Sequence, residues 1–90
     1  MYDISTLKTL IEKGETQSAI QTLDQLLVDQ PTNDALFYLR GNAYRKEENW
    51  QRAIENYLEA IALNPDSPAA EAHAMLIDIL DFYNKDMYNQ

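Results

Sequence analysis

Apolar residues recur every three or four positions in five segments of the chain, and short polar stretches separate the segments. This spacing places the apolar side chains of each segment on one face of a helix. No segment alternates apolar and polar residues as a half-buried strand does, and the chain holds a single valine. The pattern predicts an all-α chain with helices over about residues 3–13, 16–29, 34–47, 50–63 and 67–83.

Residues that cap or break helices mark the ends of these segments. Asp3 and Ser67 are candidate N-caps because their side-chain oxygens can accept a hydrogen bond from the first turn. Gly14 is expected to end the first helix, and Pro31 and Pro65 prevent the second and fourth helices from continuing. The connections of about two to four residues make neighbouring helices antiparallel.

The chain also repeats itself. Five residue identities recur at a spacing of 34 positions: Gln17/Gln51, Ala19/Ala53, Ile20/Ile54, Pro31/Pro65 and Ala35/Ala69. This spacing is the period of one kind of helix–turn–helix repeat. The chain is therefore expected to be a stack of similar units rather than a single irregular core.

The second of these units carries a pattern of aromatic and small residues. The eight positions of the pattern are Phe37, Arg40, Gly41, Tyr44, Ala53, Tyr57, Ala60 and Pro65. Gly41 and Ala53 would let two helix backbones approach closely, while the aromatic rings fill the wedge between the helices. The pattern resembles that of the tetratricopeptide repeat. Arg40 replaces the usual Leu, at a position where its stem can pack and its head can reach water.

The resemblance implies one domain over residues 1–90, an α–α superhelix of about 2.5 repeats whose fifth helix is a cap. Leu7 stands where the first unit should carry the close-approach glycine, so that unit is degenerate. The residues at 82–89 are similar to the tails of small stand-alone bacterial repeat proteins. The expected parts are a degenerate first repeat (1–31), a well-matched repeat (34–65), a capping helix (67–83) and a tail (84–90).

In this family the first helix of each repeat lines a concave groove, which implies a peptide-binding site at Tyr38, Asn42, Arg45, Lys46 and His73. The first and fifth helices would add Ile4, Lys8, Ile11, Glu12, Ala72, Leu76, Ile79 and Leu80. The expected partner is a protein or peptide with a carboxylate near Arg45 and Lys46. The alternative interpretation is that these two cations only complement the dipole at the end of their helix.

The fifth helix has more apolar surface than one neighbouring helix can cover, because its polar stripe is narrow. Residues 84–90 could fray, extend the last helix or fold back over it. Such a folded-back tail, a second copy of the chain, or a ligand could cover the remainder. In a homodimer the expected interface residues are Leu76, Ile79, Leu80 and Tyr83.

Composition narrows the class of function. The net charge of −8 disfavours nucleic acids and anionic membranes, although Arg40, Arg45, Lys46 and Arg52 concentrate four of the seven basic residues. The chain has one histidine, no cysteine and two glycines. One histidine is too few for a usual metal site, the lack of cysteine excludes thiol chemistry, and two separate glycines form no phosphate-binding loop. No enzyme and no cofactor are therefore expected. No signal sequence or membrane span is expected, which makes the cytoplasm the default location. The sequence favours a protein–protein interaction adaptor, with a self-assembling structural module as the alternative.

Overall fold

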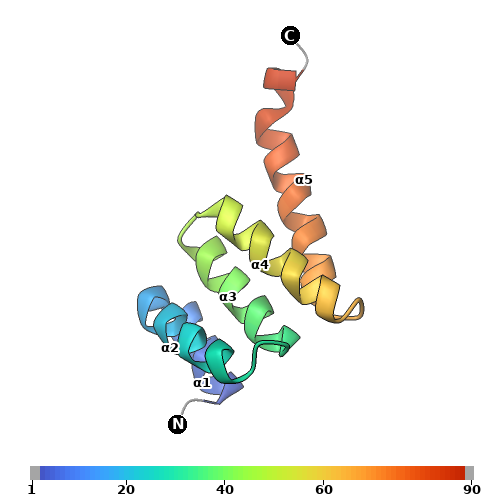
Figure 1. Ribbon diagram of the computed structural model, residues 1–90. Coiled ribbons are helices and arrows are strands. Elements are labelled where there is room, and N and C mark those ends of the chain that lie inside the picture. Colours follow the sequence, from blue (N-terminus) through green and yellow to red (C-terminus); the bar gives the residue numbers. More distant parts are fainter. Residues whose placement is uncertain (1–2, 89–90) are drawn as a thin grey trace.

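Five α-helices make up the computed structural model, which describes the backbone of residues 3–88 and the side chains of residues 3–83 (Figure 1). The helices are α1 (Ile4–Glu12), α2 (Thr16–Asp29), α3 (Asp34–Lys46), α4 (Trp50–Leu63) and α5 (Ala69–Tyr88). The predicted bounds of α2 and α4 are confirmed. The prediction made α1 one residue too long at each end and α3 one residue too long at its C-terminal end. The described part of the chain contains no strand.

Side-chain caps start the helices where the sequence places them. The Oδ1 atom of Asp3 accepts a hydrogen bond from the Thr6 amide at 2.8 Å, and these contacts with Thr6 lower the pKa of Asp3. The hydroxyl of Ser67 accepts one from the Ala69 amide at 3.0 Å. Each cap satisfies an amide that has no partner within its own helix.

The turns after α1 and α3 have the same backbone conformation. Gly14 has φ 86° and Glu48 has φ 63°, and the two residues are 34 positions apart. In both turns the next residue donates its amide to the carbonyl five positions earlier at 2.9 Å, which is a Schellman motif. A residue with a Cβ atom is strained in this left-handed conformation, so only the second turn is strained.

We expect Glu48→Gly to stabilise the protein by about 0.5–1 kcal/mol, because glycine adopts this conformation without strain. The gain is smaller than the strain itself because glycine also makes the unfolded chain more flexible. Urea denaturation of the purified variant would measure the change in the free energy of unfolding. Gly14→Ala is the matched control and should destabilise by about 1 kcal/mol; equal effects of both substitutions would contradict the explanation.

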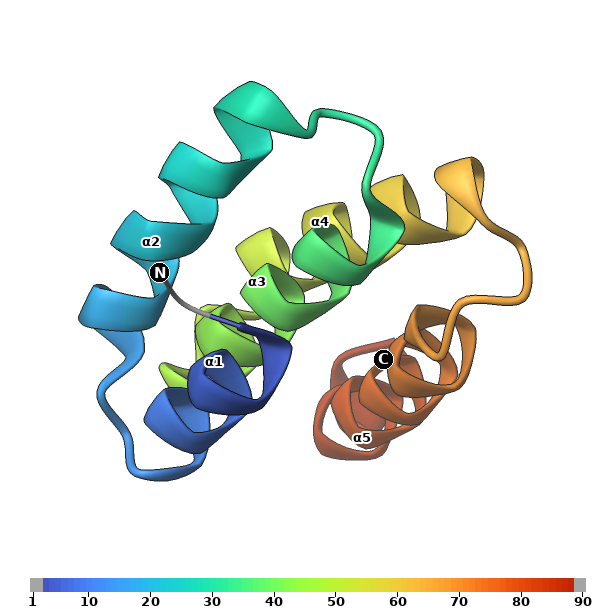
Figure 2. The same ribbon diagram turned by 90° about the horizontal axis from the view of Figure 1, so that it is seen from below.

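The first helices of the successive units share one side of the molecule. In Figure 2, α1, α3 and α5 follow one another across the lower side, with α2 and α4 above them. Consecutive helices pack against each other, and α1 also packs against α3. This order is that of a short superhelical stack.

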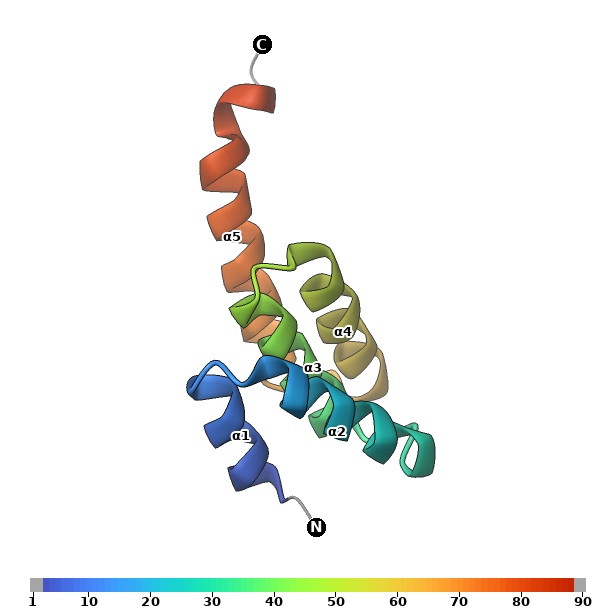
Figure 3. The same cartoon turned by 90° about the vertical axis from the view of Figure 1, so that its left-hand side faces the viewer.

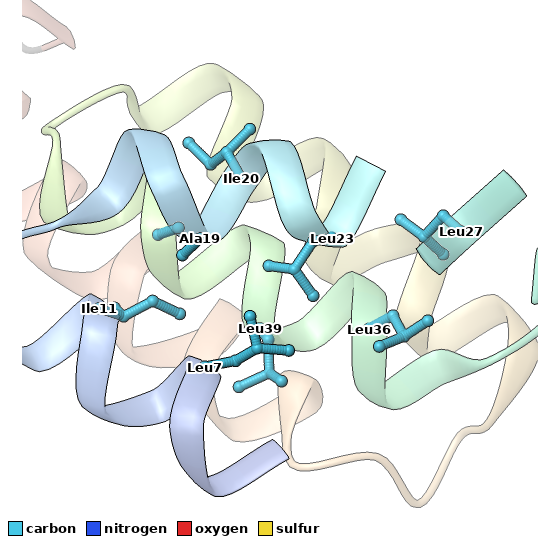
Figure 4. Close-up of a cluster of buried hydrophobic side chains, with 9 residues drawn as sticks. Leu7, Ile11, Ala19, Ile20, Leu23, Leu27, Leu36 and Leu39 are labelled. Atoms are coloured by element: carbon cyan, nitrogen blue, oxygen red, sulfur yellow. The ribbon is translucent and has the colours of Figure 1, made fainter. Parts of the chain in front are cut away.

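Two clusters of buried side chains hold the stack together. The first joins α1, α2 and α3 around Leu7, Leu23 and Leu39, which are almost completely buried (Figure 4). The second joins α4 and α5 and includes Tyr57 and Leu76. Three half-buried aromatic residues of α3 pack against both clusters: Phe37, Tyr38 and Tyr44.

Gly41 makes the close approach of α3 and α4 possible. A Cβ atom at this position would lie 2.6 Å from the ring of Tyr57 and 3.3 Å from the carbonyl oxygen of Ala53. Real Cβ atoms do not approach other heavy atoms at 2.6 Å. The role predicted for this glycine is therefore confirmed.

Arg40 does more than extend its head into water. Its guanidinium lies 5.4 Å from the centroid of the Phe37 ring and donates hydrogen bonds to Asn56 at 2.7 Å and to Asp24 at 2.8 Å. The buried amide of Asn56 also donates to the carbonyl of Arg52. Arg40 therefore connects α2, α3 and α4 at the position where the family usually has a leucine.

Among the expectations for the tail, extension of the last helix holds for residues 84–88. These residues continue α5 instead of folding back over it, while residues 89–90 lie outside the described part of the chain. Because α1 ends at Glu12 and α3 at Lys46, the 34-residue spacing would end α5 at residue 80. Instead, the end of α5 projects beyond the stack (Figures 1 and 3).

Candidate functional site

A groove of about 660 Å³ lies between the first helices of the units and is open to solvent. The residues that line it come from α1, α3, the start of α4, the turn before α5, and α5 itself. They are Ile11, Glu12, Tyr38, Asn42, Arg45, Lys46, Trp50, Pro68, Glu71, Ala72, Met75, Leu76 and Ile79.

Four of the five residues predicted for the peptide site line this groove, and all four belong to α3: Tyr38, Asn42, Arg45 and Lys46. Their spacing places them on one face of the helix. The fifth, His73, does not line the groove, contrary to the expected position. Ala72, the residue before His73, does line the groove. His73 is rotated by about 100° around α5 from Ala72 and therefore points elsewhere.

The other helices contribute part of what the sequence suggested. Ile11, Glu12, Ala72, Leu76 and Ile79 line the groove as expected. Ile4, Lys8 and Leu80 do not line it, contrary to expectation. The sequence interpretation missed Trp50, Pro68, Glu71 and Met75. The spacing of Met75 and Ile79, one turn apart on α5, was the available signal for Met75.

The groove has an apolar side and a charged side. Met75 and Ile79 on α5 are 55% and 40% exposed, so apolar surface is available there. Arg45 and Lys46 on α3 have no carboxylate within 4 Å among residues 3–83. Glu12 and Glu71 also line the groove. A ligand that fits would carry apolar side chains together with a carboxylate placed near the two cations and away from the two acids.

The basic residues of the sequence therefore do not form a single patch. Arg40 pairs with Asp24 at 2.8 Å and does not line the groove. Arg52 lies on the surface with its guanidinium 5.8 Å from the centroid of the Tyr44 ring. Only two of the four clustered cations are available in the groove.

A buried tyrosine supports the floor of the groove. The hydroxyl of Tyr57 donates a hydrogen bond to Oδ1 of Asn42 at 2.6 Å, and its ring lies 6.3 Å from that of Tyr38. Burial raises the pKa of Tyr57 above its ordinary value, although nearby Arg45 opposes the shift. The bond from Tyr57 orients the side-chain amide of Asn42, and its amide nitrogen can serve a ligand as a donor.

Tyr57 should make the free energy of unfolding depend on pH in the alkaline range. Because the pKa of Tyr57 is raised by folding, its hydroxyl loses the proton at a lower pH in the unfolded chain than in the folded one. The contribution of Tyr57 to stability is therefore complete below about pH 10 and is lost as the pH rises through the folded-state pKa. Tyr57→Phe removes this contribution, and it should cost about 1 kcal/mol at pH 7 through the lost hydrogen bond. Urea midpoints at pH 7 and 10.5 would measure both effects. An equal alkaline loss in the two proteins would contradict the assignment.

The described residues hold neither a metal site nor a membrane span. Among them, no three His, Cys, Asp or Glu side chains come together as metal ligands would. None of the helices within the described range combines the length and apolar character needed to cross a bilayer.

The sequence profile of the tetratricopeptide repeat matches residues 35–67. Over its whole length, the chain is also similar to a solved structure, the solution NMR structure of Bacteroides fragilis protein BF1650. The two chains are 53% identical with a TM-score of 0.87, and the match covers 100% of this chain and 92% of that one. The chain belongs to the tetratricopeptide repeat family. Tetratricopeptide repeats generally mediate protein–protein interactions, and their all-helical fold is typically non-enzymatic. No curated protein matches the chain.

In this tetratricopeptide repeat protein, α5 corresponds to the first helix of a third repeat, and its packing changes the expected dimer surface. Leu76 is 1% exposed because it packs on α4, and Leu80 is half-buried there, so neither forms a free surface as predicted. Ile79 and Tyr83 are exposed, as are Met75 and Phe82, which the prediction did not include.

Proposed function

We propose that the chain is a protein–protein interaction adaptor that binds a segment of another protein in the groove between α1, α3 and α5. The observation that carries the proposal is the pair of cations Arg45 and Lys46, which line the groove without a carboxylate partner among residues 3–83. A cation pair beside an apolar wall favours a ligand that has both a carboxylate and apolar anchors.

The amide of Asn42 adds direction to this site. Its nitrogen can donate to a backbone carbonyl of the ligand, while the bond from Tyr57 fixes the orientation of the amide. Glu12 and Glu71 would repel a second acid on the ligand, which gives the groove selectivity for where the carboxylate lies. The proposed ligand is therefore a segment with one acidic position and at least two apolar ones.

Affinity capture from host lysate with the wild-type chain and the Arg45→Glu/Lys46→Glu variant tests this proposal. We expect a protein that the wild type retains and the variant loses, although the variant remains folded. Lys8→Glu/Lys13→Glu is the matched control, because it changes the charge equally at exposed residues outside the groove. Equal loss with both variants would mean that general charge, and not the groove, holds the partner.

The carboxylate can be tested once a captured partner is reduced to a binding peptide. Replacing its acidic residue by the corresponding amide should weaken binding to the wild type about tenfold or more, since hydrogen bonds to charged groups contribute about 1.5–3 kcal/mol. The same replacement should have little effect on binding to Arg45→Glu/Lys46→Glu. An unchanged affinity for the wild type would contradict the assigned carboxylate.

The second candidate is a self-assembling module that dimerises through α5. Among residues 69–83 of this helix, four large apolar side chains are exposed, and Phe82 and Tyr83 are the most exposed at 76% and 77%. Exposed apolar surface of this kind is typical of protein interfaces. A molecular mass that rises with protein concentration would support this candidate, whereas peptide-induced NMR shifts confined to the groove would support the adaptor.

A further inference from the structure

The apolar wall of the groove continues along α5 beyond the end of α3. Met75 and Ile79 line the groove, and Phe82 and Tyr83 lie one turn further along α5. The four positions follow i, i+4, i+7 and i+8 and therefore form one strip on the helix, here called the α5 strip. This periodicity suits packing against another helix.

The second helix of a third repeat would not fit on α5 as α4 fits on α3. At the 34-residue spacing, Glu71 and Asp78 replace the aromatic wedge residues Phe37 and Tyr44, and Met75 replaces Gly41. A helix packed there would bury two carboxylates, which is costly without partners. The two carboxylates therefore disfavour a further repeat helix in this position, although Met75 on the same face belongs to the α5 strip.

A second copy of the chain provides a helix that matches the α5 strip. In an antiparallel pair, the two-fold axis can pass beside Ile79. Met75 of one copy then lies level with Tyr83 of the other copy, because each of these residues is four positions from Ile79. The end of α5 projects beyond the stack (Figures 1 and 3). Pairing along this helix would therefore leave the two stacks at opposite ends of the pair. Such an interface is isologous, because both copies use the same strip.

The exposed area of the α5 strip approaches what a dimer needs. Burying a Phe or Tyr removes about 150–250 Å² from water, so two rings that are about three-quarters exposed contribute roughly 600 Å² over two copies. Met75 and Ile79 of each copy bring the total towards the roughly 1,000 Å² that a specific interface needs.

We propose that the α5 helices of two copies pair antiparallel about Ile79, so that the rings of Phe82 and Tyr83 of each copy enter the groove of the other. This inference rests on the proposed function, because it gives the peptide groove a competing occupant. The dimer is then a closed form, and a partner segment must displace the second copy before it can bind.

Disulfide cross-linking tests the pairing, and the chain has no cysteine of its own to interfere. We expect Ile79→Cys to form a linked dimer on mild oxidation. Met75→Cys alone should not link, because its two copies lie about eight residues, or roughly 12 Å, apart along the pair, but it should link when mixed with Tyr83→Cys. Val28→Cys, on exposed α2, is the control and should stay monomeric. Linking of Met75→Cys and Val28→Cys as fast as Ile79→Cys would overturn the pairing.

Trp50 reports whether the groove is occupied, since it is the chain's only tryptophan and lines the groove. We expect its emission to shift to the red on dilution, together with a halving of the mass in sedimentation equilibrium. Phe82→Asp, which changes an exposed residue, should be monomeric and red-shifted at every concentration. A wild type that is monomeric at about 1 mM, or a dimer with unchanged Trp50 emission, would overturn the proposal.

The failure of this inference is separable from failure of the proposed function. Phe82→Asp should retain a captured partner at least as well as the wild type, because its groove is always open. If the wild type is monomeric but still captures a partner through Arg45 and Lys46, only the dimer is wrong. If the dimer forms and Phe82→Asp captures no partner, the dimer proposal stands and the adaptor proposal fails.

Discussion

Replacing Gly41 by alanine should destabilise the protein by about 2 kcal/mol and lower its melting temperature by roughly 10 °C. The new Cβ atom would lie 2.6 Å from the ring of Tyr57, which is completely buried and bonded to Asn42, so the ring cannot move without disturbing the groove floor. Overpacking of this kind costs about 1–3 kcal/mol, and the better helix propensity of alanine offsets only about 1 kcal/mol. Thermal and urea denaturation would measure the change.

The sign of this effect separates the explanation from its alternative. A glycine that merely lies within a helix would make alanine stabilising, so an increase in stability would refute the close contact. Tyr57→Leu gives a second check, because it removes most of the ring. In that background Gly41→Ala should cost clearly less, and purely additive effects of the two substitutions would contradict a direct contact.

Leu76→Ala should detach α5 from the stack. Leu76 is the one large side chain of α5 that is almost fully buried among the residues up to 83, and its neighbours in the cluster on this helix are Ala69 and Ala72. Truncation of such a leucine costs about 2–5 kcal/mol. Because α5 packs mainly on α4, most of the loss should fall on this helix, and its amides should exchange with solvent much faster than those of α3.

Met75→Ala is the matched control for this experiment. Met75 precedes Leu76 on the same helix but is 55% exposed, so its truncation should change stability by no more than about 0.5 kcal/mol. If Leu76→Ala destabilises α3 and α5 equally, the stack unfolds as one unit and the terminal helix is not independent. Leu76→Ala should also lose binding of a groove ligand, since α5 forms one wall of the groove.

Hydrophobic periodicity was enough to predict the five helices, and the 34-residue spacing was enough to predict their order of stacking. The end of α5 was left open, although neither Gly nor Pro follows Pro68 to stop the helix. The strained turn at Glu48 was also missed, because glutamate rarely adopts a left-handed conformation. Its only signal was Gly14, one repeat earlier.

The groove was predicted less completely than the fold, for geometric reasons. Residues on α3 could be assigned because the family pattern fixes the orientation of that helix. His73 was misplaced because one position on α5 means a rotation of about 100°, which the weaker pattern of the last helix does not fix. The hydrogen bond from Tyr57 to Asn42 depends on interatomic distances between two helices, and no spacing along the chain encodes it.

The aromatic residues shared by the two buried clusters have a consequence for ligand binding. Tyr38 packs against both clusters and also lines the groove, so it belongs to the joint between the two halves of the stack. A ligand that contacts Tyr38 would bind only while that joint is closed, and it would therefore oppose local opening. Hydrogen exchange should then slow in α1 and α2 as well, although few residues of these helices touch the ligand. The groove would thus link recognition to the cohesion of the whole stack.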